Sequence, residues 1–159
     1  MVDYDWEKKQ LKAIEEHFKK KNISYEYIDI DMGNEVVKPA IYTTVKLKGL
    51  DFDVYVSAQD VHDVQWIVIR CLVCDLKDLD LNEINKILKI ALTVNYYIPE
   101  TTFSLINDSL FIENDMPLEV SLESFNFEIR GLEIGIGIFQ QNMEDLGLTI
   151  TSTKGILKK

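Results

Sequence analysis

The chain has 159 residues, 47% of them hydrophobic, and a formal net charge of −10. This length fits one domain with a sizeable core, and the acidic balance opposes binding to nucleic acid or to an anionic membrane, since either partner requires a basic surface. The apolar stretches are too short to span a membrane and the N-terminus lacks a signal-peptide pattern, so we expect a cytoplasmic protein.

The first half of the chain predicts a helix followed by antiparallel strands. In chain order the segments are a helix over 4–21, a strand over 23–31, a loop over 32–39, an alternating hairpin of 41–47 and 52–57, and a buried strand over 65–74. Asn22 follows three lysines and is the expected helix stop, and Gly49 marks the hairpin turn.

The second half predicts two helices that flank another hairpin. Asp80 and Glu83 form a capping box at the start of a helix that continues to about Val94, with Leu81, Ile84, Leu88 and Ala91 expected on its buried side. Strands over 102–106 and 109–113 turn at Asn107, and residues 116–120 link them to the last helix.

Ser121 to Leu146 predicts a long C-terminal helix on which the rest of the chain packs. Ser121 is the expected N-cap and Gly147 the stop after the last turn. Spacing of three and four predicts a core stripe made of Leu122, Phe125, Ile129, Leu132, Ile136, Phe139, Met143 and Leu146.

A second apolar set lies on the opposite side of this helix. It consists of Phe127, Gly131, Ile134 and Ile138, with Gly135 at its edge. Two interpretations remain open, because the set can be a seam between two subunits or a close fit beneath a bulky sheet residue such as Trp66. As candidate interface residues we take these five positions.

This order of elements predicts an α+β protein with a mostly antiparallel sheet, in the sequence α-ββββ-α-ββ-α, covered by the three helices. Residues 1–147 are expected to form a single domain and residues 148–159 a flexible tail, because helical periodicity is lost there.

Four stretches carry a family resemblance over roughly residues 40–147. They are the strand containing Trp66, the helix DLNEINKILKIALTVN, the hairpin FSLINDSLFIE and the segment PLEVSLESFNFEIRGLEIGIGIF. This pattern resembles the YbjN-like family and its relatives, the chaperones of bacterial type III secretion. The resemblance implies a small acidic α+β protein that dimerises and binds or regulates other proteins, and it transfers no catalytic residue.

Two stretches could carry chemistry. Cys71 and Cys74 end an apolar strand, where three residues span roughly 10 Å and the side chains point to opposite faces, so we expect unreactive cysteines rather than a disulfide or a zinc site. Asp29 and Asp31 resemble the paired aspartates of magnesium-dependent phosphatases, although the hairpin that follows does not fit an alternating βα fold.

The leading functional hypothesis is a non-enzymatic, chaperone-like or regulatory protein that acts as a homodimer and binds a polypeptide client of basic character, without a cofactor. The alternatives are a small magnesium-dependent phosphatase that uses Asp29 and Asp31, or a module that binds a small ligand.

Overall fold

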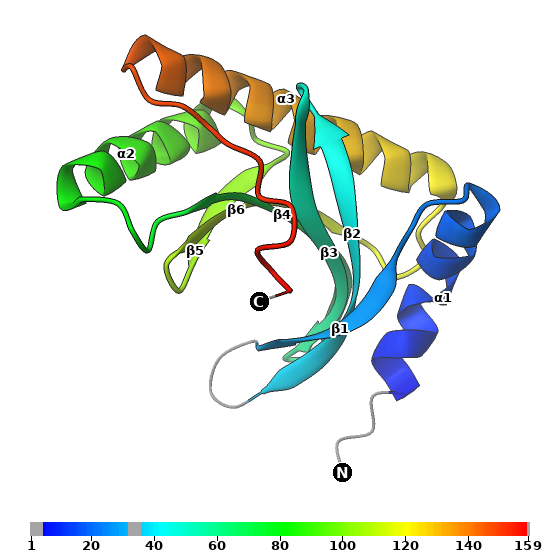
Figure 1. Ribbon diagram of the computed structural model, residues 1–159. Helices are drawn as coiled ribbons and strands as arrows, with labels where there is room; N and C mark the ends of the chain where they lie inside the picture. Colours follow the sequence, from blue (N-terminus) through cyan, green and yellow to red (C-terminus); the bar gives the residue numbers. More distant parts are fainter. Residues whose placement is uncertain (1–4, 32–35, 159) are drawn as a thin grey trace.

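The protein is described as a computed structural model that covers residues 5–31 and 36–158. Over these residues the elements follow the predicted order, which confirms the α+β class (Figure 1). The elements are α1 (Asp5–Lys20), β1 (Glu26–Asp31), β2 (Val37–Leu47), β3 (Leu50–Val61), β4 (Val64–Asp75), α2 (Leu81–Tyr97), β5 (Thr102–Ile106), β6 (Ser109–Met116) and α3 (Leu122–Asp145).

The strands form one antiparallel sheet in the order β1-β2-β3-β4-β6-β5. β2 and β3 are joined by Lys48 and Gly49, whose φ angles are 49° and 82°. β3 and β4 are joined in the same way by His62 and Asp63, at 52° and 64°. Two successive positive φ angles match the twist of the flanking strands, which is why two residues suffice for each turn. The hairpin predicted around Gly49 is therefore confirmed.

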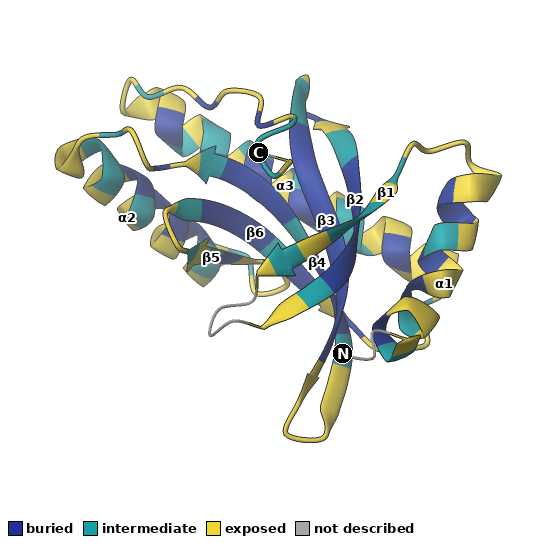
Figure 2. Ribbon diagram, turned by 60° about the horizontal axis from the view of Figure 1, so that its bottom comes forward, coloured by how far each residue is buried: buried dark blue, intermediate teal, exposed yellow. Residues whose placement is uncertain are grey.

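The two faces of this sheet have different coverings. The three helices pack on one face, the inner face, and enclose a core that includes Phe18 of α1, Val94 of α2 and Phe139 of α3. The opposite, outer face carries a smaller apolar cluster. The C-terminal segment crosses in front of β3 and β4 on this outer side (Figure 1), and buried stripes on the helices face the sheet (Figure 2).

Helix α3 has the predicted caps and most of the predicted core stripe. The hydroxyl of Ser121 accepts a hydrogen bond from the backbone N–H of Ser124 at 3.1 Å, and Gly147 has a φ of 71° after the last turn. The stripe is buried at Phe125, Leu132, Ile136, Phe139 and Met143. Its predicted ends, Leu122 and Leu146, are 40% and 53% exposed because they extend beyond the sheet at the two ends of the helix.

The predicted buried side of α2 is wrong in part. The capping box of Asp80 and Glu83 is present. However, Leu81 is 73% exposed and Ile84 and Leu88 are only partly buried, whereas the buried residues are Ile87, Ile90, Ala91 and Val94. The helix has apolar residues on more than one side, so its periodicity was compatible with several buried faces. Contact with α3 and β5 determines which of these faces is buried.

Strand β2 begins earlier than the sequence predicts. Met32 to Glu35 of the predicted loop lie outside the described residues, but Val37 to Pro39 belong to β2. Pro39 lies where β2 pairs with Asp29 of β1 but its pairing with β3, which begins at Ala40 and Ser57, has not yet started, so β2 has only one neighbouring strand at this position.

Candidate functional site

The C-terminal segment, expected to be a flexible tail, runs back along the outer face. Thr153 is 2% exposed and Ile150 is 6% exposed. The backbone N–H of Thr153 donates to the carbonyl of Asp51 at 3.0 Å, and the hydroxyl of Ser152 donates to the same carbonyl at 2.7 Å. The segment is thus held against the first residues of β3.

Asp53 is the centre of this contact. Its carboxylate is fully buried and lies between Tyr42 and the C-terminal segment. Oδ1 accepts hydrogen bonds from the Tyr42 hydroxyl at 2.5 Å and from the backbone N–H of Gly155 at 2.8 Å, and Oδ2 accepts the N–H of Leu157 at 2.9 Å. A buried carboxylate is stable only with such donors, and two of the three are main-chain groups of the C-terminal segment.

Thr153 fills the gap where β3 and β4 separate. Residue pairing between these strands stops at Val54 and Cys71. Beyond that pair, the hydroxyl of Thr153 accepts the N–H of Asp53 at 3.1 Å and donates to the carbonyl of Leu72 at 2.8 Å. One side chain therefore satisfies a donor on β3 and an acceptor on β4 that would otherwise be buried without partners.

The apolar part of the segment packs beside this polar anchor. Ile156 and Leu157 contact a cluster on the outer face whose buried members are Ala40, Tyr55, Leu72 and Phe111. The rings of Tyr55 and Phe111 meet edge to face, with centroids 5.9 Å apart. The outer face thus offers a small hydrophobic surface next to a backbone-binding carboxylate.

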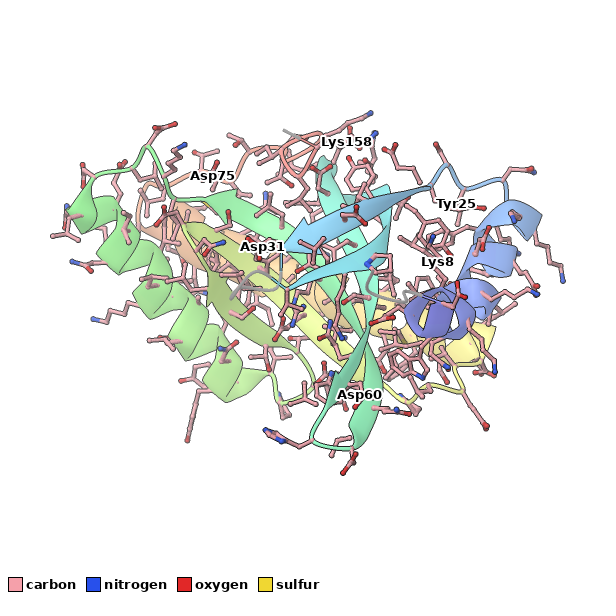
Figure 3. All side chains as sticks on the ribbon, turned by 90° about the horizontal axis from the view of Figure 1, so that it is seen from below. Lys8, Tyr25, Asp31, Asp60, Asp75 and Lys158 are labelled. Atoms are coloured by element: carbon pink, nitrogen blue, oxygen red, sulfur yellow. The ribbon has the colours of Figure 1, made fainter. Side chains whose placement is uncertain are left out.

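The last described residue, Lys158, closes the contact. Its ammonium forms an ion pair with Glu26 of β1 and lies 4.8 Å from the centroid of the Tyr42 ring. Lys158 is labelled in Figure 3. The ion pair with Glu26 raises the pKa of Lys158. A cavity of about 630 Å³ runs along this contact and is lined by carboxylates and lysines of both sides, among them Glu26, Asp51 and Lys154.

Arg70 and Glu113 occupy the centre of the outer face, on β4 and β6. The Nε of Arg70 donates to the Glu113 carboxylate at 2.5 Å, and its guanidinium lies 5.9 Å from the ring centroid of Tyr55. Burial raises the pKa of the Tyr55 hydroxyl. Nη1 of Arg70 is buried and has no hydrogen-bond partner within the described chain. The pair places one positive and one negative side chain in contact with each other in the middle of the outer face.

The five candidate interface residues of α3 separate into two groups. Gly131 and Gly135 lie against the sheet, where an added Cβ would be 2.9 Å from Asn114 Nδ2 and 2.3 Å from Ile112 Cδ1 respectively. Ile112, rather than Trp66, is thus the bulky residue beneath Gly135. Phe127, Ile134 and Ile138 remain 61%, 58% and 38% exposed. The two glycines therefore allow α3 to pack closely on the sheet within one chain, whereas the three large apolar side chains are exposed to solvent.

The paired aspartates lie on an edge strand. Asp29 and Asp31 are both exposed on β1, which is an edge strand paired with β2 in the described part of the chain, and Asp31 ends the strand (Figure 3). Across residues 5–31 and 36–158, no three His, Cys, Asp or Glu side chains come together in a way that could hold a metal ion.

The two cysteines are free, as the sequence predicts, but their arrangement differs. A bulge between Leu72 and Cys74 shifts the register, so that Cys71 pairs with Ile112 and Cys74 with Leu110. Since Leu110 and Ile112 share a face of β6, the bulge brings both cysteines to the inner face, and the expectation of opposite faces is wrong. Burial raises the pKa of Cys71, and it raises that of Cys74 to about 11.

No protein-family model matches this sequence, and no curated protein matches it either. The fold is that of an α+β protein with one antiparallel sheet and helices on one face. None of the helices in the described parts of the chain is long and apolar enough to cross a membrane. The geometry of the outer face is therefore the feature that bears on function.

Sequence reasoning did not identify Asp53 or Thr153. Asp53 alternates with Phe52 and Val54 along β3 and so resembles an ordinary solvent-facing residue. The one available signal is the pair Ile156 and Leu157, two apolar residues in a segment that lacks helical periodicity and that would gain nothing from them if it stayed in solvent.

Proposed function

We propose that the chain is a non-enzymatic polypeptide-binding protein whose outer face accepts a segment with a basic and apolar character. The observation that carries this proposal is that the Asp53 carboxylate accepts hydrogen bonds from two backbone N–H groups, those of Gly155 and Leu157. Backbone contacts of this kind supply affinity without dependence on sequence, and neighbouring pockets add selectivity.

The chemistry around Asp53 supports a basic segment. Glu26 and Asp51 border the cavity along the C-terminal segment, and Glu26 already holds Lys158. The segment itself combines lysines with the apolar pair Ile156 and Leu157. In this proposal the chain's own C-terminal segment occupies the site, and a client of similar composition competes with it. Because the segment is tethered, its effective concentration is high, and the client binds more weakly to the intact protein than to one without the tether.

The proposal is tested by cutting the tether in the folded protein. A protease site inserted between Thr151 and Ser152, both exposed, allows cleavage after folding. A fluorescent peptide of sequence TSTKGILKK should then exchange into the cleaved protein, and anisotropy should report saturable binding. Asp53→Asn should weaken this binding, whereas Asp78→Asn, at an exposed position before α2 that does not line this cavity, should change it little. Equal binding of a scrambled peptide would contradict the proposal.

For the exposed isoleucines of α3 we propose a second copy of the chain as the partner. Ile134 and Ile138 border a hollow of about 380 Å³ that also includes Gly137 and Lys48. Antiparallel pairing of two α3 helices about a twofold axis midway between these isoleucines places each Ile134 on the partner's Ile138. Phe127 belongs to a different groove.

A further inference from the structure

A groove of about 550 Å³ lies between the end of α1 and the start of α3. We name it the α1–α3 groove. α1 contributes His17, Lys20 and the following Lys21, and α3 contributes residues that include Phe127 and Arg130. Spacings of three and four place each set along one side of its helix, so the groove runs between two facing helix stripes.

The charge of this groove is opposite to that of the whole chain. The side chains of Lys20, Lys21 and Arg130 line it, and none of these three side chains forms an ion pair or hydrogen bond with the part of the chain that the structure describes. Among the described residues that line the groove, Glu123 is the only one with a carboxylate. In a chain with 27 acidic and 17 basic residues, three unpaired cations around one cavity need an explanation, because carboxylates are available to pair with them.

His17 provides an independent observation. The side chain lines the groove, yet the residue is only 5% exposed, and its Nδ1 is buried without a hydrogen-bond partner. Its ring packs edge to face on Phe125, with centroids 5.9 Å apart. Burial, together with the charges of Lys21 and Lys20, lowers the pKa of His17. The wall of the groove thus includes a residue with a buried, unpartnered polar atom, next to cations that attract anions.

Apolar surface lies next to these cations. Phe127 is 61% exposed and Leu122 is 40% exposed, and both line the groove. An inorganic anion would leave this surface uncovered, whereas a peptide with carboxylates beside an aromatic or aliphatic side chain would cover it and pair the cations. A nucleic acid or an anionic membrane would in addition face the repulsion of the net charge of −10.

We propose that the α1–α3 groove binds an acidic polypeptide segment, with its carboxylates on Lys20, Lys21 and Arg130 and an apolar side chain on Phe127. This site is distinct in place and in charge preference from the outer face, and the argument for it does not depend on the proposed function. The two sites would allow one chain to contact a basic and an acidic segment at the same time.

The test uses the intact protein and a fluorescent peptide of sequence EEFEDLEEF, with QQFQNLQQF as the uncharged match. The acidic peptide should bind saturably and the uncharged one should not. Lys21→Gln and Arg130→Gln should each weaken binding about three- to fivefold, as expected for exposed ion pairs. Lys12→Gln makes the same charge change on an exposed part of α1 outside the groove and should leave binding unchanged.

Three further outcomes decide the proposal. Binding should raise the pKa of the His17 ring measured by NMR, because a carboxylate beside it favours the imidazolium. Equal weakening by Lys12→Gln would mean diffuse attraction to the chain and would overturn the proposal. Displacement of the peptide by inorganic phosphate at equal concentration would also overturn it, because the groove would then be a site for small anions.

Discussion

Asp53 of β3 and Gly155 of the C-terminal segment are 102 positions apart in the chain, yet the carboxylate of one accepts the backbone N–H of the other at 2.8 Å. This contact closes the outer face of the sheet. It also makes the stability of a strand near the middle of the chain dependent on residues at its end.

Asp53→Asn should therefore lower the free energy of unfolding by about 2–3 kcal/mol. The amide side chain keeps the shape of the carboxylate, but its nitrogen cannot accept a hydrogen bond, so one of the buried donors from Tyr42, Gly155 or Leu157 loses its acceptor. Urea denaturation gives the difference, and amide exchange of Gly155 and Leu157 should accelerate. Asp51→Asn is the control and should stay within about 0.5 kcal/mol of the parent.

Two glycines of α3 should respond to alanine in opposite directions. In Gly135→Ala the new Cβ would lie 2.3 Å from Ile112 Cδ1, so we expect a loss of about 1–3 kcal/mol despite the better helix propensity. In Gly137→Ala the nearest atom is Cε of Lys48 at 2.8 Å, at the mobile end of a side chain that can move aside. That variant should gain up to about 1 kcal/mol. Thermal melts of both variants against the parent measure the difference, and equal effects would contradict the packing described here.

Stability should fall as the pH drops through the neutral range, and His17 should be a cause. Its pKa in the fold lies below the ordinary 6.5, chiefly through burial, so the unfolded chain binds a proton more readily than the folded one. The contribution of His17 is fully present above pH 6.5 and decreases as the pH falls toward the lower value in the fold.

Urea midpoints measured between about pH 7.5 and 5.5 should decline less in His17→Gln than in the parent, because carboxylates titrate mostly below this window. His62→Gln, in the turn between β3 and β4, is the matched control and should keep the slope of the parent. If the urea midpoint of the parent protein does not change across this pH window, then burial of His17 does not make stability depend on pH.

Both cysteines should be poorly reactive in the native state. Cys71 is fully buried, and the pKa of Cys74 is raised to about 11 by burial and by Asp75. Since the thiolate is the reactive form, a disulfide reagent at about pH 8 should label the native protein far more slowly than the urea-unfolded chain. Cys74→Ala should leave only the slower reaction of Cys71. Rapid labelling of both thiols without denaturant would contradict this arrangement.

The proposed pairing of α3 predicts the mass in solution. Light scattering should give a dimer for the parent and a folded monomer for the double variant Ile134→Glu, Ile138→Glu, because four carboxylates would then meet at the axis. Leu92→Glu, on an exposed position of α2, should remain a dimer. A parent that is monomeric at high concentration would remove this proposal and leave the two peptide sites unaffected.

The sequence predicted the features that local patterns determine. The cap at Ser121, the turn at Gly49 and the alternation of the central strands all depend on neighbours within a few residues, and the structure confirms them. The buried side of α2 was ambiguous because apolar residues surround the helix. The orientation of Cys74 depended on a bulge that leaves no mark in the apolar run from Cys71 to Cys74.

The residues of the outer face could not be predicted for a different reason. Asp53 is buried by a segment a hundred positions away, and Thr153 bridges two strands that separate only in three dimensions. A single sequence contains no record of contacts over that distance. The same limit applies to the α1–α3 groove, which forms only when the ends of two helices far apart in the chain meet.

The distance between Asp53 and its main-chain partners also has a consequence during synthesis on the ribosome. The strands β1 to β4 and the helix α2 are made before residues 153–157 exist, so Asp53 must remain hydrated on the nascent chain until the last part of this sequence has been translated. For that interval the outer face is open to water and to other polypeptides near the ribosome exit. The protein therefore passes through a period in which this face has no occupant of its own.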